Sequence, residues 1–262
     1  MNLDNLIETI VAERIPLRFV SPHLDDAVLS CGNLMTYLLG KTDMEVWTVF
    51  TEASAPPHTL SAKAFLSQCG ISDANRLFRV RKDEDKEVLG RLQSGFRHLG
   101  HPDALFRRRK VGLFLRTIAR LVPEFDHAYP TYRWHVVTGR VALSEEAFQS
   151  HILSEITEGV TERVPILFFP LGLGKHVDHV LVREVGLQYS GPVVFYSDFP
   201  YSLSDRPDQG FLDRHGLRSH QFGGAEGAKR ELIGLYGSQH LFEGDIPVVS
   251  EEYFFRDAIM KV

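Results

Sequence analysis

Only two cysteines, Cys31 and Cys69, occur among the 262 residues of this chain. A small secreted domain held together by disulfides uses many more cysteines for its length, because each bridge consumes two of them. The composition therefore argues against a disulfide framework and favours a reducing compartment. We expect a cytoplasmic protein.

No run of apolar residues is long enough to cross a bilayer as a helix, which takes about 20 of them. The longest such stretch, Val164 to Leu173, is much shorter and contains two prolines. Near the N-terminus, Asp4, Glu8 and Glu13 interrupt the apolar residues at helical spacing, whereas an export signal needs a basic start and an unbroken apolar centre. We predict neither a membrane span nor an export signal.

Positive charge is in deficit, because 29 Lys and Arg residues face 34 Asp and Glu residues and leave a net charge of -5. Proteins that bind nucleic acids carry a cationic surplus that neutralises phosphates, so nucleic acid is not an expected partner. One basic cluster, Arg107 to Lys110, departs from this balance. We interpret it as a solvated turn before a helix, with contact to an anionic substrate group as the alternative.

No linker rich in Pro, Gly or Ser and no internal repeat divides the chain. Hydrophobic residues make up 44% of it, which is enough for a sizeable core. We predict one elaborated domain over residues 1–262.

Strand and helix patterns alternate from the beginning of the chain. Leu17 to Ser21 is predicted as a strand, Ala27 to Leu39 as a helix and Glu45 to Phe50 as a second strand. Such a unit joins two parallel strands by a right-handed crossover. We therefore predict an α/β fold with a Rossmann-like, mostly parallel sheet flanked by helices. A third strand is expected at Leu77 to Val80 and a helix at Arg81 to Leu99.

This alternation is lost at about residues 101–163. Val111 to Leu121 and Glu145 to Thr161 have helical patterns, separated by an aromatic-rich stretch. We interpret the region as a divergent helical insertion that forms a cap or wall over the site, with a purely structural extension as the alternative.

Strand and helix patterns resume after the insertion. The predicted elements are a buried strand at Ile166 to Phe169, a helix at Asp178 to Tyr189, a strand at Val193 to Tyr196, an irregular loop at Ser202 to Gly227, a helix at Ala225 to Tyr236, and a C-terminal segment, Glu251 to Met260, that docks on the sheet.

Two polar segments follow strands of this pattern. Ser21-Pro22-His23-Leu24-Asp25-Asp26 ends the first strand, and Gly174-Lys175-His176-Val177-Asp178-His179 follows the strand that ends at Phe169. Loops that follow parallel strands share one edge of the sheet, so these two segments can converge although about 150 residues separate them.

The residue types in these segments suit a metal ion. His23 and Asp26 lie three positions apart and can reach one ion from a tight turn, while His179 completes a set of two histidines and one aspartate. A catalytic zinc commonly keeps three such ligands and an open position for water. The same set suits non-haem iron. We therefore expect Zn²⁺, with Fe²⁺ or another divalent metal as the alternative.

The remaining residues of the two segments have the chemistry of a hydrolase. Asp25 is free to accept a proton from a metal-bound water, whose pKa zinc lowers from 15.7 toward about 7. His176 can stabilise an oxyanion or protonate a leaving amine, and Asp178 can orient His176 through a hydrogen bond. Either segment alone is more simply explained as a helix cap or a satisfied polar contact. Their occurrence together favours the metal site.

These motifs resemble those of the PIG-L/LmbE-like metal-dependent N-deacetylases, in which the first reads Pro/Ala-His-Pro-Asp-Asp and the second His-x-Asp-His. The resemblance spans both ends of the chain and the sheet, and it fades across about residues 105–163. Leu24 replaces the usual proline and Ala27 a frequent glutamate; neither position supplies a ligand or the base, so we interpret them as marks of a subgroup. Further similarities are Arg81-x-x-Glu84, Asp198-Phe199-Pro200-Tyr201, Lys229 and Tyr236-Gly237-Ser238-Gln239.

The resemblance implies that His23, Asp26 and His179 hold the zinc, that Asp25 is the general base and that His176 is the electrophilic or acid partner. It also implies the reaction, which is hydrolysis of an N-acetyl or other N-acyl group from an amino sugar. The expected partner is a small-molecule N-acetylated sugar or glycoside.

For Arg81 and Asp103 we expect exposed ion pairing, with contacts to sugar hydroxyls as the alternative. Two other functions compete with the deacetylase. A non-catalytic Rossmann-like sugar- or nucleotide-binding protein is disfavoured because no Gly-x-Gly-x-x-Gly follows the first strand. A metal-dependent phosphoesterase would need a second metal or a phosphate clamp.

Overall fold

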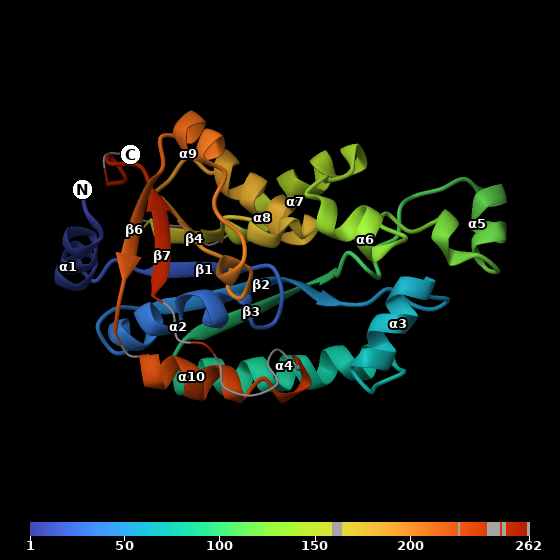
Figure 1. Cartoon of the computed structure of the whole chain (residues 1–262), viewed down its shortest axis with the longest axis horizontal. Helices are drawn as coiled ribbons and strands as arrows, with labels where there is room; N and C mark the ends of the chain where they lie inside the picture. The colour runs from blue at the N-terminus through green and yellow to red at the C-terminus, as the bar shows by residue number, and fades with distance from the viewer. Residues whose placement is uncertain (159–163, 225, 240–246, 248–249, 261–262) are drawn as a thin grey trace.

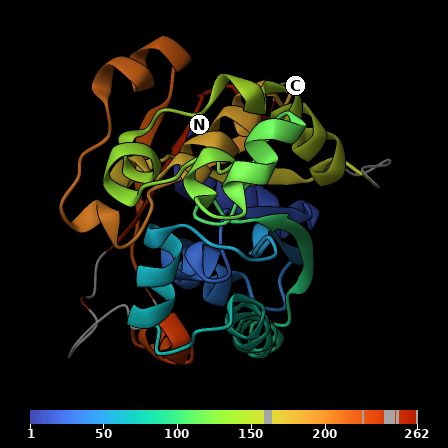
Figure 2. The same ribbon diagram turned by 90° about the vertical axis from the view of Figure 1, so that its right-hand side faces the viewer.

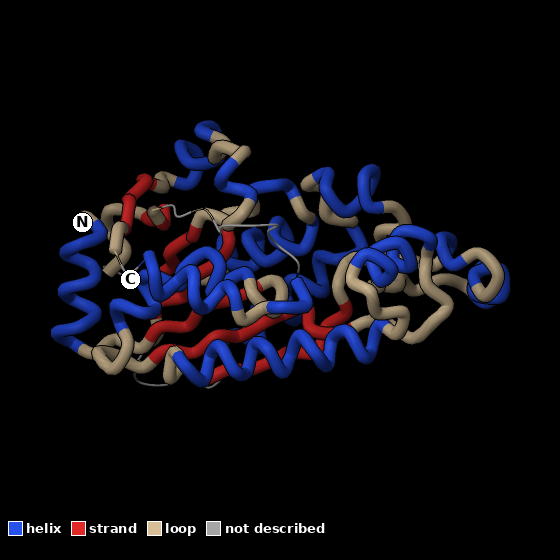
Figure 3. The backbone as a smooth tube through the Cα atoms, turned by 60° about the horizontal axis from the view of Figure 1, so that its bottom comes forward, coloured by secondary structure: helices blue, strands red, loops and turns tan. Residues whose placement is uncertain are grey.

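Seven strands form one mixed sheet in the interior of the molecule (Figures 1 and 3). The computed structural model describes residues 1–158, 164–224, 226–239, 247 and 250–260. The strand order is β3-β2-β1-β4-β5-β7-β6; β1 to β5 run parallel, and β7 pairs antiparallel with both β5 and β6. The strands are β1 (Leu17–Ser21), β2 (Met44–Glu52), β3 (Gly95–Pro102), β4 (Ile166–Pro170), β5 (Val193–Tyr196), β6 (Arg218–Phe222) and β7 (Glu251–Phe255).

Ten α-helices occur in the described part of the chain, and they cover both faces of the sheet. In Figure 1, α2, α4 and α10 lie below the sheet and α7, α8 and α9 above it, so the expected Rossmann-like arrangement is confirmed. The helices are α1 (Leu3–Glu13), α2 (Asp26–Leu38), α3 (Leu60–Gln68), α4 (Ala74–Arg91), α5 (Leu113–Ala119), α6 (Tyr132–His135), α7 (Glu146–Ile156), α8 (Val177–Gln188), α9 (Gln209–His215) and α10 (Glu226–Gly234).

Alternate residues of β4 face the two sides of the sheet. Ile166 and Phe168 belong to the apolar cluster shared with α1, α2 and α4, whereas Leu167 and Phe169 belong to the cluster shared with α7, α8 and α9. Successive side chains of a strand point to opposite faces, so a strand covered on both faces reads as a continuous apolar run. This burial is why the strand could be located from sequence.

The sheet changes direction of winding between β1 and β4. β1 pairs with β2 on one side and with β4 on the other, and the loops after β1 and β4 leave at the same edge. In doubly wound sheets this reversal opens a crevice at the carboxyl ends of the strands. Both polar segments lie there.

The third strand was placed wrongly by the sequence analysis. Leu77 to Val80 is part of α4, which Asp73 caps by accepting hydrogen bonds from the amides of Asn75 and Arg76. The actual strand, β3, lies at Gly95–Pro102, where a helix had been expected to continue. β3 is an edge strand and is largely polar, so it lacks the apolar pattern of a buried strand.

The segment Ser202 to Gly227 contains structure where an irregular loop was expected. It includes α9 and the edge strand β6, whose five residues are not fully buried. The C-terminal segment does dock on the sheet, but it does so as β7, inserted between β5 and β6. The predicted helix at Ala225 to Tyr236 is present as α10, with Ala225 outside the described residues.

The predicted insertion holds α5, α6, α7 and short 3-10 turns, and its residues 159–163 lie outside the described part. Figure 2 looks onto the end of the molecule that carries α5 and α6. This is also the end toward which β2 and β3 run (Figure 1). Among the described helices, none has the length and apolarity that crossing a membrane requires.

We predict that Phe168→Ala lowers the free energy of unfolding by about 3–5 kcal/mol, because it opens a cavity in the core. Phe168 is 1% exposed and its ring stacks on that of Phe19 at a centroid distance of 4.5 Å. Phe96→Ala is the matched control, since Phe96 is 45% exposed on an edge strand; its effect should stay within about 0.5 kcal/mol. Equal losses in urea unfolding would contradict this assignment of the core.

Candidate metal centre and active site

Three side chains from the two motifs meet at one carboxylate oxygen. Asp26 Oδ2 lies 3.0 Å from His23 Nδ1 and 3.3 Å from His179 Nε2. Asp26 begins α2 directly after β1, and His179 lies in the first turn of α8 after β4. The adjacent parallel strands therefore bring together the three residues that were expected to hold a metal.

The buried carboxylate of Asp198 orients His179 from the side of the ring opposite Asp26. His179 Nδ1 lies 2.7 Å from Oδ1 of Asp198, whose Oδ2 accepts hydrogen bonds from the amides of Gly172 and Leu173 at 2.7 and 2.9 Å. This contact leaves Nε2 of His179 facing Asp26. Carboxylate partners of this kind set the tautomer and direction of metal-ligating histidines. The sequence analysis named Asp198 only within a segment similar to the family, although its position after β5 was the available signal.

Asp178 supplies the corresponding contact to His23. Its Oδ2 lies 3.1 Å from His23 Nε2 and accepts a hydrogen bond of 2.9 Å from the amide of Ala104, while Oδ1 accepts a hydrogen bond of 2.6 Å from Arg107 Nη2. Both oxygens are thus occupied by groups other than His176. The expected hydrogen bond between Asp178 and His176 is made by the backbone amide of Asp178 and not by its carboxylate, which points to His23 and the insertion.

The side chain of His176 caps α8, which is the simpler role that the sequence analysis named as the alternative for either segment. Its Nδ1 accepts a hydrogen bond of 3.3 Å from the amide of Asp178. An accepting Nδ1 places the ring hydrogen of the neutral imidazole on Nε2. Burial, and next the charge of His23, lower the pKa of His176 to about 3. The imidazole is therefore neutral at pH 7 and can donate a hydrogen bond from Nε2.

The loop that leads into His176 depends on Gly174. Gly174 has φ +74°, and a Cβ built on it would lie 2.2 Å from Cδ1 of Tyr201. Only glycine accommodates this combination of left-handed backbone and close approach.

Asp25 occupies the N-cap position of α2 without capping the helix. No hydrogen bond reaches its carboxylate from any residue that the structure describes, and the Oγ of Ser21 instead accepts from the amide of Ala27. Asp25 is 7% exposed. Burial, followed by the charge of Asp26, raises its pKa to about 7. A buried carboxylate with a pKa near neutrality is suited to accept a proton.

The electrostatics of the site favour a bound cation. Burial lowers the pKa of His23, but its contacts with Asp178 and Asp26 outweigh this effect and raise the pKa well above its usual value. The pKa of His179 is also raised, since Asp26 and Asp198 outweigh its burial. The carboxylates thus favour the protonated form of both imidazoles, and a divalent metal would compete with those protons. Two imidazoles and a carboxylate form a donor set that fits Zn²⁺ or Fe²⁺.

A second group with metal-ligand spacing shares His23 with the first. His23, His176 and Asp178 also have ligand atoms within 4.8 Å of one another. In this group, however, the carboxylate is neutralised by Arg107 and has no exposed surface. Nδ1 of His176 is moreover occupied by a backbone amide. The group centred on Asp26 therefore fits a metal better.

Arg81 and Asp103 both lie at the site, in other elements than expected. Arg81 is inside α4 and not after a strand, and Asp103 follows β3 and not a helix. Both are buried, so exposed ion pairing is not their role. Asp103 Oδ2 lies 3.4 Å from His23 Nε2, and the charge of Arg81 lowers the pKa of Asp25 against the effect of burial. Nε of Arg81 is buried without a hydrogen-bond partner among the described residues.

Arg107 is the main residue of the site that sequence reasoning misplaced. It is buried, and it pairs with Asp178 and with Glu145, which in turn accepts a hydrogen bond from Tyr129. Its guanidinium also lies 4.7 Å from the centroid of the Phe50 ring. Neither a solvated turn nor a substrate contact describes this position. The basic cluster offered a signal, but nothing in it distinguished this arginine from its neighbours.

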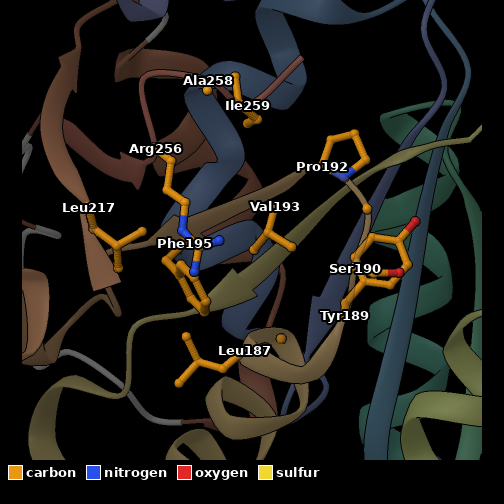
Figure 4. Close-up of a pocket in the computed structure, with 12 residues that line it drawn as sticks. Leu187, Tyr189, Ser190, Pro192, Val193, Phe195, Leu217, Arg256, Ala258 and Ile259 are labelled. Carbon is orange, nitrogen blue, oxygen red and sulfur yellow. The ribbon is translucent and has the colours of Figure 1, made fainter. Parts of the chain in front are cut away.

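A cavity of about 310 Å³ lies away from these residues. It is lined by the end of α8, the start of β5 and the C-terminal segment, including Val193, Phe195 and Arg256 (Figure 4). It shares no residue with the group formed by His23, Asp26 and His179, which we call the Asp26 group. A second cavity of about 410 Å³ lies beside the second motif and is lined by Gly172, Lys175 and Arg206 among others.

Known proteins resemble this chain in sequence and in fold. The sequence profile of the family described as PIG-L, GlcNAc-PI de-N-acetylase, matches residues 18–190. The 2'-N-acetylparomamine deacetylase of Niallia circulans is 30% identical over 201 residues, which cover 70% of this chain and 66% of that relative. The match thus spans slightly less than two thirds of the relative's length.

Solved structures share the fold. A teicoplanin deacetylase in complex with teicoplanin has a TM-score of 0.72 and 22% identity, and the match covers 92% of this chain and 97% of that one. A zinc-inhibited form of teicoplanin deacetylase has a TM-score of 0.70 and 21% identity, with 91% and 97% covered. Identities this low support the likeness of fold alone.

We predict that Asp198→Asn weakens Zn²⁺ binding about 10–100-fold, because His179 loses the carboxylate that directs its Nε2. Titration of the metal-free protein with Zn²⁺ measures the effect. Asp205→Asn is the matched control, since Asp205 is exposed nearby and should leave the affinity unchanged. Wild-type affinity in the Asp198 variant would contradict this role.

We also predict that Arg107→Met lowers the free energy of unfolding by about 3–5 kcal/mol, because it leaves two buried carboxylates without their cation. Arg109→Met is the control, since Arg109 is exposed and forms no ion pair with a described residue. Urea unfolding compares the two variants. A loss below about 1 kcal/mol for Arg107→Met would show that the buried pairs contribute little.

Proposed function

The chain belongs to the PIG-L family, and we propose that it is a metal-dependent N-deacetylase acting on an amino sugar within a glycoside. The observation that carries this proposal is the pairing of two features at one edge of the sheet. Two histidines meet at the carboxylate of Asp26, and the adjacent carboxylate of Asp25 accepts no hydrogen bond from a described residue and has a pKa of about 7. One feature fits a metal and the other a general base.

The names of related proteins support an acetamide as the bond that is hydrolysed. The family is named for removing the acetyl group of GlcNAc-PI, and the relative from Niallia circulans for deacetylating 2'-N-acetylparomamine. Both names describe hydrolysis of an acetamide. We therefore propose an N-acetylated amino sugar as the reacting unit.

His23, Asp26 and His179 would hold the metal, which we propose to be Zn²⁺ with Fe²⁺ as the alternative. When bound, a divalent metal supplies Lewis acidity, which polarises a carbonyl oxygen and lowers the pKa of water. The carboxylates of Asp178 and Asp198 hold the two imidazoles in place from the opposite side of each ring. His23 and His179 would therefore be oriented before the metal and the substrate bind.

Asp25 would accept the proton of the attacking water as the oxygen bonds to the acetamide carbonyl carbon. Its raised pKa then allows it to return that proton to the nitrogen of the breaking C–N bond, so that acetate and a free amine leave. His176 would donate from Nε2 to the carbonyl oxygen while negative charge develops there, since its Nδ1 is held by a backbone amide. Because the pKa of His176 is low, its ring is neutral and acts as a hydrogen-bond donor, not as an acid.

Arg81 and Asp103 would bind the sugar. Both are buried, Arg81 near the carboxylate of Asp25 and Asp103 beside His23. Nε of Arg81 has no hydrogen-bond partner among the described residues, and a sugar hydroxyl oxygen could accept its hydrogen. This use explains a buried arginine with no ion pair to a described residue better than packing alone.

Phosphoester hydrolysis has less support from the site. Arg107, a buried cation of the insertion, is committed to Asp178 and Glu145. It is therefore not available as a phosphate clamp. A non-catalytic binding protein would not require a buried carboxylate at Asp25 whose pKa is raised to about 7.

The proposal is tested with the metal-reconstituted protein and a panel of N-acetylated aminoglycosides and N-acetylglucosaminyl glycosides. We expect the mass of a substrate to fall by one acetyl group, with release of acetate. Metal removal by a chelator should abolish this activity, and readdition should restore it. Phosphate release from phosphorylated sugars without acetate release would instead identify a phosphoesterase.

We predict that Asp25→Asn reduces kcat about 10²–10⁴-fold, because the amide cannot accept the proton of water. Metal affinity should be retained, since Asp25 is not in the ligand group. Asp83→Asn, on the exposed face of α4, is the matched control and should keep full activity. Near-wild-type turnover by Asp25→Asn would overturn the assignment of the base.

A further inference from the structure

The insertion exposes an unusual number of large apolar side chains at one end of the molecule. They lie on α5 and the turn that follows it, and we call them the apolar tip: Leu113, Phe114, Leu115, Leu121, Val122 and Phe125. Leu113, Phe114 and Leu121 are 82%, 78% and 87% exposed. Within α5, only Ala119 is buried. A soluble surface rarely places so many apolar side chains together unless the patch contacts something.

The apolar tip continues onto neighbouring elements. The amide of Leu60 at the start of α3 donates to Glu124 Oε1 at 2.9 Å, and the amide of Tyr132 at the start of α6 donates to Ser61 Oγ at 3.2 Å. Leu60 is 76% exposed and Tyr132 is 44% exposed. Hydrogen bonds thus hold α3, the end of the tip and α6 against one another. The apolar surface is part of the fold and not a loose loop.

The charge around the apolar tip is opposite to that of the chain. Between Arg107 and Arg140 the sequence holds eight Lys and Arg residues and two acidic ones, although the net charge of the whole is -5. The structure pairs Arg107 and Arg108 with buried carboxylates. The other six are exposed and form no ion pair with a described residue: Arg109, Lys110, Arg116, Arg120, Arg133 and Arg140.

We propose that the apolar tip and its basic surround form a docking surface for an anionic phospholipid bilayer. A short amphipathic segment with Leu and Phe beside Lys and Arg inserts its apolar side chains at the boundary between headgroups and acyl chains. The cations then lie among the anionic headgroups, whose negative charge attracts them. The chain rests on the bilayer without crossing it.

Docking in this way sets the orientation of the site. α5 lies at the end of the molecule toward which β2 and β3 run (Figure 1), and the metal-ligand group lies at the carboxyl ends of the strands. The active edge of the sheet would therefore be turned toward the bilayer. A substrate held at a membrane surface would reach the site from that side.

A second copy of the chain fits this surface less well. A two-fold interface places the same patch on both partners, so the basic residues of one copy would lie opposite those of the other. Their repulsion disfavours self-association, whereas anionic lipid neutralises the same charges. Charge complementarity therefore selects the bilayer.

Sedimentation of the full chain with lipid vesicles tests the proposal. We expect binding to vesicles of phosphatidylcholine mixed with phosphatidylglycerol, weaker binding to pure phosphatidylcholine, and loss of binding as salt is raised. The measurement needs no substrate and no metal, so its outcome is independent of the proposed deacetylase activity.

Two variants separate the apolar and the charged contributions. Leu113→Ser combined with Phe114→Ser and Leu121→Ser should weaken binding to the mixed vesicles by at least about tenfold, because the inserted apolar surface is lost. Arg116→Ser combined with Arg120→Ser should abolish the preference for anionic lipid. These side chains are exposed, and circular dichroism verifies that each variant is folded.

Leu203→Ser combined with Phe96→Ser is the matched control, because both residues are about half exposed elsewhere on the molecule. It should bind vesicles as the wild type does. Three results would overturn the proposal: no binding to either vesicle, equal weakening by the control, or sedimentation velocity showing a dimer that the Leu113, Phe114 and Leu121 variant dissociates.

Discussion

The carboxylate of Asp178 joins three parts of the molecule through charge. One oxygen accepts a hydrogen bond from Arg107 of the insertion, and the other contacts Nε2 of His23 in the turn after β1, while the aspartate itself lies in the first turn of α8. The attraction of Arg107 and the contact with His23 outweigh the effect of burial and keep the pKa of Asp178 well below its usual value. The orientation of His23, and with it the Asp26 group, depends on this carboxylate staying charged and in place.

Such an arrangement serves geometry more than stability. Buried ion pairs contribute little net stability, because desolvation of the charges offsets their attraction, yet removal of one partner is costly. Here the pairs of Arg107 define one position for the insertion relative to the strands. The opposite sides of His23 and His179 are fixed by Asp178 and Asp198 in the same manner. The apolar core supplies stability, and the buried charges specify where the imidazoles of His23 and His179 point.

The sequence predicted the parts of this structure that follow from burial and from strand connectivity. β1, β4 and β5 are covered on both faces and read as apolar runs, and the rule that loops after parallel strands share an edge placed His23 beside His179. β3 and β6 were missed because edge strands carry polar residues. The partners of Asp178 were also missed, since hydrogen bonds between Asp178 and Arg107, 71 positions apart, leave no local pattern. Sequence spacing suggested that Asp178 orients its neighbour His176. In the fold, the carboxylate of Asp178 contacts His23.

The central claim is that one metal is held by His23, Asp26 and His179 and that Asp25 stays free beside it. Its most direct test is a crystal structure of the zinc-loaded protein with anomalous scattering recorded at the zinc edge. We predict one strong peak about 2.0–2.2 Å from the ligand atoms of those three residues, with the Asp25 carboxylate outside that distance. A peak bound by His23, His176 and Asp178, or by Asp25, would contradict it.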